Sequence, residues 1–474
     1  MAICACGAGK RWGESVKKWN DLVYSDRVDK IAGVVQWLCL LVVAMVELLF
    51  FLPGEAADSI VYAFLEWKLV DVAILFLAAS FFRKQLLRSR GYFLFALLTV
   101  LWFYVVRAIH LGLEGTNQNP GAFICAYLLC FPFAAAVGDG KRMLGLKALA
   151  AVFMLVGAAF GFFAVLLVTG RLPAFLDGYV YWDGPRFGTM GHPNLCATVL
   201  MISIGLTVGF ALRAKRRRIK FPLLALAALE FWAISLTNSR TAIVLTCAML
   251  GGILICLLRR PGWKGLVPAF AAALAAMALL FCVSRTIFSW NNARLTELAV
   301  EAQQTGEEIG LTLNEDGTLK TQNTQASFAD NLKTLNSRTW IWSVAVDGLR
   351  NNPRILLFGT ENVRQTVFPE GGSVQHTHNA WLETLYRLGI PGLLAALALS
   401  VLAVWDGAVL LWRNDDLLHS CVAMTALCLM GCALLEPYLF TVSAQFHYFD
   451  FLFLLSLGYL DQWRMEKEGE KWKC

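Results

Sequence analysis

The chain has 474 residues, of which 58% are apolar and only 16% are charged, and its mean hydropathy is +0.58. A soluble domain carries about 25% charged residues, so this composition argues against a water-soluble fold. The formal net charge is +7, and basic residues gather in several short loops between apolar runs. That distribution is a signal of membrane orientation, which makes nucleic-acid binding an unnecessary hypothesis.

Apolar runs of about 20 residues, the length that crosses a bilayer as a helix, recur along the chain. They predict an all-α polytopic membrane protein with twelve spans, near 31–52, 60–82, 92–113, 120–137, 146–169, 193–212, 221–236, 241–258, 266–284, 381–412, 417–437 and 444–460. The second span contains Glu66, Lys68 and Asp71. The tenth is long enough to begin as a surface helix before it enters the bilayer.

Loops rich in lysine and arginine alternate with loops that are poor in them, as at 83–90, 141–147, 213–220 and 259–264. Under the positive-inside rule these loops and both termini face the cytoplasm, so the protein is expected in the cytoplasmic (inner) membrane. The predicted division of the chain is a cytoplasmic segment (1–30), nine spans (31–284), an extracytoplasmic loop carrying catalytic residues (285–378), three spans (379–461) and a cytoplasmic tail (462–474).

The segments 170–192, 237–240 and 285–378 then face outward, and Arg186 and Arg240 stand out there because short outer loops hold few basic residues. An arginine at a membrane boundary needs a partner. Arg186 either snorkels to headgroups, pairs with a carboxylate such as Asp183, or has a functional role. In the long loop, Ser337 is a candidate N-cap and Asn351-Asn352-Pro353 a stop signal, which predicts a helix between them.

Four short blocks combine these outer residues. They are Arg186–Asn194, Thr237–Thr241, Ser337–Trp340 followed by Pro353, and His376–Asn379 followed by Gly389-Ile390-Pro391-Gly392. Their order and spacing over roughly 180–395 resemble the O-antigen ligase and Wzy-type polymerase family. The pair His378-Asn379, followed after nine residues by Gly389-x-x-Gly392, is its most specific feature. Leu393 stands where the ligase form usually has a small or polar residue, so ligase and polymerase both stay open.

The resemblance implies a GT-C-like fold and a membrane glycosyltransferase that needs neither metal nor cofactor. Its donor would be a glycan on undecaprenyl pyrophosphate, and a lipid or glycan acceptor would receive it at the outer face. Arg240 and Arg338 match the family's pyrophosphate-contacting arginines, with Arg186 as the third candidate. Guanidinium groups suit this role because they bind phosphate oxygens bidentately and stay charged.

The resemblance also makes His378 the candidate catalytic base, since a neutral imidazole can take the proton of an acceptor hydroxyl at neutral pH. His376 either orients His378 or packs beside it, and Asn379, Gly389 and Gly392 are supporting residues. The two glycines also suit close helix contacts. His376 and His378 together could chelate a metal, but no third and fourth ligand at diagnostic spacing is apparent.

Two rival functions remain. A Wzy-type polymerase would use the same donor and differ only in its acceptor. A multi-span transporter would place ionisable residues within its spans, and Glu66, Lys68, Asp71 and Arg107 keep this alternative open. The tryptophans Trp340, Trp342 and Trp381 form either an interfacial belt or sugar-stacking surfaces.

Overall fold

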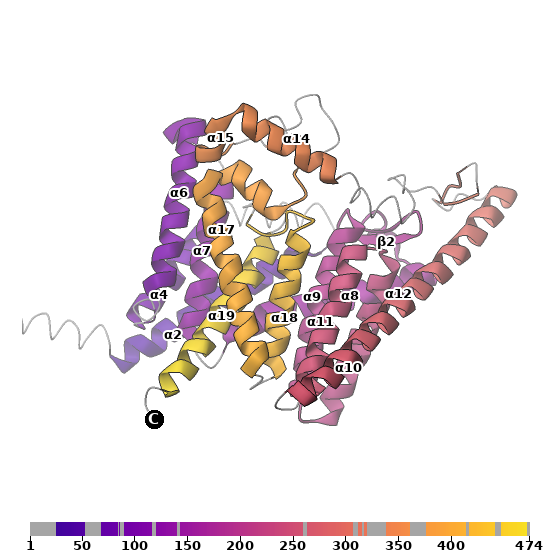
Figure 1. Cartoon of the computed structure of the whole chain (residues 1–474), viewed down its shortest axis with the longest axis horizontal. Helices are drawn as coiled ribbons and strands as arrows, with labels where there is room; N and C mark the ends of the chain where they lie inside the picture. The colour runs from indigo at the N-terminus through magenta and orange to yellow at the C-terminus, as the bar shows by residue number, and fades with distance from the viewer. Residues whose placement is uncertain are drawn as a thin grey trace, which may run out of the picture.

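The computed structural model is a bundle of helices with one short hairpin (Figure 1). It describes residues 25–52, 68–83, 85, 90–115, 120–139, 143–258, 263–306, 311–314, 317–319, 338–360, 376–413, 417–440 and 447–471. The candidate N-cap Ser337 and the second-span residue Glu66 lie outside these ranges.

Within the described ranges, seven helices are long and apolar enough to cross a membrane. They are α2 (Asp26–Phe50), α8 (Leu144–Val168), α9 (Pro193–Arg213), α10 (Arg217–Leu236), α11 (Arg240–Leu258), α12 (Trp263–Thr305) and α17 (Ala380–Arg413). Shorter apolar stretches lie in α4 (Leu69–Phe82), α6 (Arg90–Gly115), α7 (Pro120–Asp139), α18 (Leu417–Ala433) and α19 (His447–Lys471). The predicted helical multi-pass membrane protein is confirmed. The count of twelve crossings stays a prediction.

The helix α9 forms the centre of the bundle. Its most apolar stretch is 78% buried, whereas that of α12 is 11% buried, and α9 packs against α8, α10, α11 and α18. His192 caps its N-terminus by accepting a hydrogen bond from the Asn194 N–H, and Pro193 occupies the first turn, where its missing N–H costs nothing. The local sequence therefore fixes where this central helix begins.

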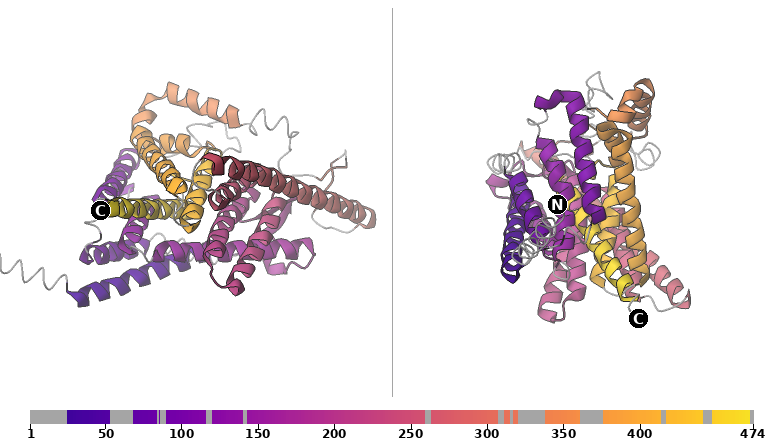
Figure 2. Two further views of the ribbon diagram at one scale, coloured as in Figure 1. Left: turned by 60° about the horizontal axis from the view of Figure 1, so that its bottom comes forward. Right: turned by 90° about the vertical axis from the view of Figure 1, so that its left-hand side faces the viewer.

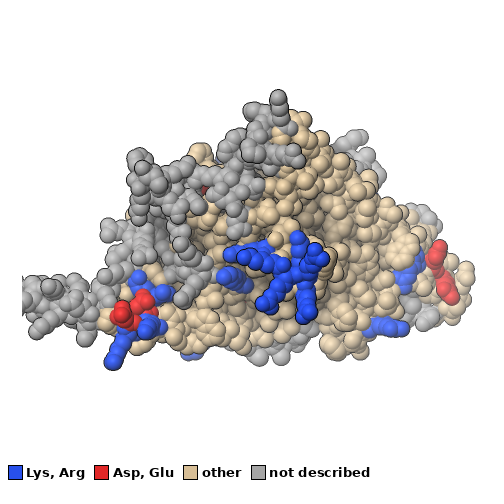
Figure 3. Space-filling view, turned by 90° about the horizontal axis from the view of Figure 1, so that it is seen from below, with Lys and Arg blue, Asp and Glu red and all other residues tan. Residues whose placement is uncertain are grey.

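Basic side chains gather at one end of the bundle (Figure 3). The turn between α9 and α10 exposes five of them: Arg213, Lys215, Arg216, Arg217 and Arg218. The opposite end carries the hairpin and the two helices α14 (Arg338–Asn351) and α15 (Pro353–Phe358), which lie across the start of α17 (Figures 1 and 2). The stop predicted at Asn351-Asn352-Pro353 is confirmed, since α14 ends at Asn351.

The helix α12 is much longer than the predicted span 266–284. It has 43 residues and thus a length of about 64 Å, twice the roughly 30 Å of a bilayer core. The first part of the expected loop 285–378 is therefore helical and projects away from the bundle (Figure 1). The apolar part of α12 ends near residue 284, but the helix continues because no glycine or proline interrupts it before Gly306. Gly306 has a φ of +75°, which is typical of the residue that follows a helix end.

The helix α17 is kinked at Gly389, where φ is +68°. The kink separates a first segment, which starts at Ala380 near α14 and α15, from the longer segment that follows. That the first segment lies on the membrane surface stays a prediction. At the kink the backbone touches the end of α15. A Cβ on Gly389 would lie 2.3 Å from the Leu357 carbonyl oxygen, and one on Gly359 would lie 2.3 Å from that of Arg387.

Gly389→Ala is expected to destabilise the protein more than Gly170→Ala. Both glycines have a φ near +67°, and a positive φ strains a residue with a Cβ by about 1–3 kcal/mol. Only Gly389 adds a backbone clash, because nothing lies within 4 Å of a Cβ on Gly170. Thermal unfolding of both variants in detergent measures the difference, and equal melting temperatures would contradict the close contact.

Candidate active site

The predicted outward segment 170–192 forms a β-hairpin of β1 (Val180–Asp183) and β2 (Arg186–Thr189). Its antiparallel register pairs Asp183 with Arg186 and Tyr181 with Gly188. Gly188 is required there, because a Cβ would lie 2.9 Å from the Tyr181 ring. All four residues of β2 are buried, so the hairpin holds Arg186 inside the protein next to the start of α9.

Each nitrogen of the Arg186 guanidinium has a partner within the protein. Nε donates to the Thr237 carbonyl (3.0 Å), Nη2 donates to Asn194 Oδ1 (2.9 Å), and Nη1 lies 3.6 Å from Asp183 Oδ2. Burial lowers the pKa of Arg186, and the Asp183 carboxylate opposes that shift. The geometry therefore favours the pairing with Asp183 over an arginine that is free to bind a ligand.

Glu436, three residues after the end of α18, connects the other site residues. Its Oε1 forms an ion pair with Arg338 Nη2 and accepts a hydrogen bond from Asn194 Nδ2 (3.3 Å), while Oε2 lies 3.1 Å from His378 Nδ1. Only 8% of Glu436 is exposed. The buried Glu436 carboxylate thus contacts the predicted base His378 and the predicted phosphate-binding Arg338. It also contacts Asn194, which accepts a hydrogen bond from Arg186.

The ionisation of Glu436 decides which ring nitrogen of neutral His378 carries the proton. Burial disfavours the charged carboxylate, but the hydrogen bond with His378 and the charge of Arg338 outweigh it and lower the pKa of Glu436 to about 2. An ionised carboxylate can only accept, so His378 must donate through Nδ1–H. In the neutral ring the lone pair then lies on Nε2, the nitrogen that can take a proton.

The loop around His378 is held by several hydrogen bonds. The buried Glu383 carboxylate accepts from the Thr377 N–H (2.9 Å) and hydroxyl (3.1 Å), and Trp342 Nε1 donates to the Thr377 carbonyl (3.0 Å). Asn379 Oδ1 accepts from the Leu382 N–H (2.9 Å) at the start of α17. His378 itself has a φ of +51°, an uncommon conformation for a residue with a side chain. The surroundings therefore fix its backbone.

His376 packs against His378 instead of orienting it. Their ring centroids lie 4.4 Å apart at an interplanar angle of 84°, and His376 Nδ1 has no hydrogen-bond partner among the described residues. Burial, together with the neighbouring His378, lowers the pKa of His376. His376 is thus held neutral, and the orienting contact to His378 comes from Glu436.

Arg240 begins α11, and a second arginine lies close to it. Arg285 of α12 is near enough for its positive charge to act on Arg240, and its Nη1 donates to Asn238 Oδ1 (2.6 Å) in the turn that precedes α11. Two positive charges that act on each other make a place that favours an anion. Arg285 was missed from the sequence, although it follows the predicted span end at 284 on the outer side, where Arg186 and Arg240 drew attention.

Glu436 was also missed, and a signal for it was present. It is a carboxylate at the outer end of a predicted span, 417–437, and ionisable residues at such places are functional candidates. Of the predicted supporting residues, Asn379 caps α17 and Gly389 makes its kink, while Gly392 lies against the Leu388 side chain. Both glycines therefore serve the shape of α17.

The three tryptophans differ in their surroundings. Trp342 donates to the Thr377 carbonyl, and Trp381 donates to Ser400 Oγ (3.1 Å), so both are bound within the protein. Trp340 is 57% exposed on α14, which begins at the site residue Arg338. Among these three, Trp340 is the one with an exposed ring.

Most of the described charged residues that left the transporter alternative open lie at the end of a helix. Lys68 precedes α4 and Asp71 lies in its first turn, and both are exposed. Arg107 is buried within α6, over the ring of Phe103. Apart from Arg107, the described charges of this set are at a helix end, where a midplane transport site would not be built.

The fold and the site define a multi-pass helical membrane protein with a buried cluster of arginine, glutamate and histidine at one end of its bundle. Residues 222–397 match the model of the family described as O-antigen ligase. This match supports a relation to the O-antigen ligase family, as the resemblance implied, and a function of the ligase or polymerase type. No curated protein matches the chain.

The matched region contains Arg240, Arg338 and the block from His376 to Gly392. It begins later than the resemblance over 180–395 suggested, so the block Arg186–Asn194 lies outside it. Glu436 lies beyond its other end. Within the described ranges, no three His, Cys, Asp or Glu side chains are grouped as metal ligands, and metal independence stays a prediction.

Proposed function

We propose that the protein is a glycosyltransferase of the cytoplasmic membrane that moves a glycan from a polyprenyl pyrophosphate, such as undecaprenyl pyrophosphate, onto an acceptor at the outer face. The observation that carries this proposal is the chain of contacts from His378 through Glu436 to Arg338. These contacts join the proposed base, His378 with its proton on Nδ1, to the guanidinium of Arg338, a cation that can bind phosphate. The family match agrees with this chemistry.

The proposed reaction is a displacement at the anomeric carbon. Nε2 of His378 takes the proton of the acceptor hydroxyl, whose oxygen forms the new bond to the anomeric carbon while the bond to the pyrophosphate oxygen breaks. Negative charge then grows on the leaving pyrophosphate. Arg338 and the pair of Arg240 and Arg285 stabilise it electrostatically. A guanidinium has five N–H donors, and the described contact with Glu436 involves one nitrogen of Arg338.

The orientation of the protein follows from its charge. The end of the bundle that carries the basic turn between α9 and α10 faces the cytoplasm, together with both termini, and the candidate site faces outward. A lipid-linked donor would then enter from the outer leaflet. A Wzy-type polymerase differs from a ligase only in using a glycan as the acceptor, and a transporter is supported less because the described charged cluster lies at one end of the bundle.

Arg240→Lys and Arg338→Lys are each expected to lower transfer about a hundredfold, the scale of losing one preorganised donor to a growing negative charge. Lysine keeps the charge but loses the planar fork that holds two phosphate oxygens. Arg186→Lys is expected to be milder, because its nitrogens are bound within the protein. Transfer from a purified lipid-linked donor, at equal protein amounts and without an ion gradient, measures the effect.

A matched control for these variants is Arg350→Lys. Arg350 lies on the same helix as Arg338, its side chain is 75% exposed, and it pairs only with the exposed Asp347 among the contacts described. Its replacement should leave transfer unchanged. Normal transfer in both Arg240→Lys and Arg338→Lys would remove pyrophosphate binding by these residues from the proposal.

A further inference from the structure

A cavity of about 440 Å³ lies between α2, α4, α7 and α8. Leu144, the first residue of α8, lines it, whereas the hairpin of the candidate active site follows the other end of this helix. The 25 residues of α8 span about 37 Å, so the cavity and the candidate active site lie at opposite ends of the bundle. The cavity is therefore separate from the proposed transfer site.

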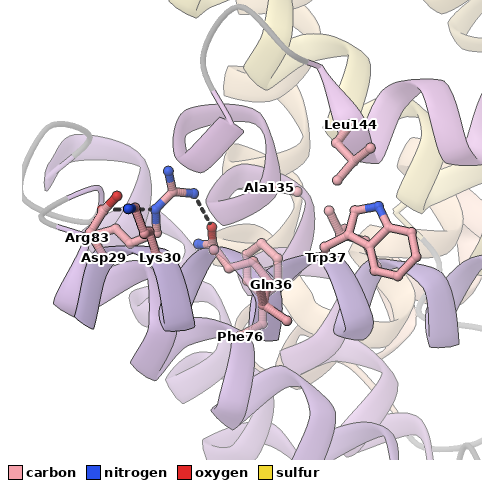
Figure 4. A pocket seen from close by; sticks show the side chains of 11 residues that line it. Asp29, Lys30, Gln36, Trp37, Phe76, Arg83, Ala135 and Leu144 are labelled. Atoms are coloured by element: carbon pink, nitrogen blue, oxygen red, sulfur yellow. Dashed lines mark hydrogen bonds and ion pairs between the residues drawn. The ribbon is translucent and has the colours of Figure 1, made fainter. Parts of the chain in front are cut away.

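The lining of the cavity has a polar end and an apolar end (Figure 4). Arg83 lies at the polar end, where its Nε contacts Asp29 (3.2 Å) and its Nη1 donates to Gln36 Oε1 (2.7 Å). Lys30 lies beside them. Trp37 and Leu144 lie at the other end. An amphipathic lining of this kind matches a molecule with a charged head and an apolar tail.

The cavity opens on the face of α2 that points away from the bundle. Two lining residues, Val34 and Trp37, are 59% and 48% exposed, and Ile31 on the same helix is 64% exposed. Apolar side chains exposed on a membrane-spanning helix face lipid. Lys30 and Arg83 lie at the ends of α2 and α4, the level at which lipid headgroups are found.

We propose that this cavity binds the phosphate headgroup of an anionic phospholipid, with the start of an acyl chain along Trp37 and Leu144. Among the described residues, the lining holds two cations, Lys30 and Arg83, and one anion, Asp29, which leaves one net positive charge for a phosphodiester. Arg83 is already fixed by Asp29 and Gln36, so it is ordered before the lipid binds. In the proposed orientation this lipid belongs to the cytoplasmic leaflet, where basic pockets between helices select anionic headgroups.

Native mass spectrometry of the full-length protein in detergent tests this, with phosphatidylglycerol and phosphatidylcholine of matched chains as probes. The wild-type protein should retain more phosphatidylglycerol than phosphatidylcholine. Lys30→Gln should weaken phosphatidylglycerol binding about fivefold, the effect of one surface lysine, and leave phosphatidylcholine binding unchanged. Arg27→Gln, which removes an exposed charge on α2 that does not line the cavity, is the charge control.

Val34→Trp should block the mouth of the cavity and reduce retention of phosphatidylglycerol, whereas Ile31→Trp, on the same exposed face but outside the lining, should not. Equal effects of these two variants, or of Lys30→Gln and Arg27→Gln, would mean nonspecific lipid around the helices and overturn the proposal. Displacement of the bound lipid by inorganic phosphate would also overturn it, in favour of a site for a soluble anion. None of these outcomes depends on glycan transfer.

Discussion

His378→Ala is expected to lower the single-turnover rate of glycan transfer about a hundredfold or more, the usual scale for removing a general base. In the proposed reaction Nε2 takes the acceptor proton, because the contact with Glu436 places the other ring proton on Nδ1. Binding of the lipid-linked donor should survive, since the proposal assigns pyrophosphate binding to the arginines. Measuring donor binding and single-turnover transfer on the same preparation separates the two effects.

His376→Ala is the matched control, because His376 touches His378 edge to face but is not bound to Glu436 in the contacts described. It should keep appreciable activity. The assignment of the base would be wrong if His378→Ala transfers normally or if His376→Ala is the inactive variant.

Glu436→Gln is expected to reduce transfer about a hundredfold or more, as the loss of an orienting carboxylate does when it leaves a histidine base in the wrong tautomer. Glutamine can present either an oxygen or an amide to Nδ1, and it carries no charge to stabilise the imidazolium that forms. Single-turnover transfer again measures the effect. Donor binding reports in addition whether Arg338 stays in place.

The same substitution should also destabilise the fold, because it leaves Arg338 buried without its charge partner. Breaking a buried ion pair costs about 3–5 kcal/mol. The pKa of Glu436, about 2, lies below the ordinary value near 4.3, so its stabilisation is complete above that value and is lost as the pH falls toward 2. At neutral pH the full loss should appear in thermal unfolding of Glu436→Gln. A variant that melts like the wild-type protein would contradict the ion pair.

The helices were predictable from the sequence because a bilayer imposes one length on every apolar run. The predicted spans near 193–212 and 241–258 coincide with α9 and α11 within a few residues. The true end of α12 was not predictable in this way. The continuation of α12 to Thr305 is polar, so hydropathy predicts that the membrane span ends before it. The same residues also form helix, and hydropathy does not report helix propensity.

The chemistry of the site was only partly predictable. Arg240, Arg338 and His378 were proposed as site residues from the motifs that carry the family resemblance. The pairing of Arg186 with Asp183, one of the alternatives, is present in the structure. Neither Glu436 nor the hairpin was foreseen. The place of Glu436 at the outer end of a predicted span was a signal that it could be functional. Its role was not predictable, because its partners come from segments as distant as Asn194 and Arg338, which no local pattern brings together.

The position of Glu436 has a consequence for how relatives of this protein are compared. The carboxylate and its partner Asn194 flank residues 222–397 on opposite sides in the sequence. A search restricted to residues 222–397 would score the arginines and the histidine of a homologue but would not test for the carboxylate that contacts them. Homologues that keep His378 and Arg338 but have no acidic residue after the equivalent of α18 should be sorted separately as candidates for lost or altered transfer.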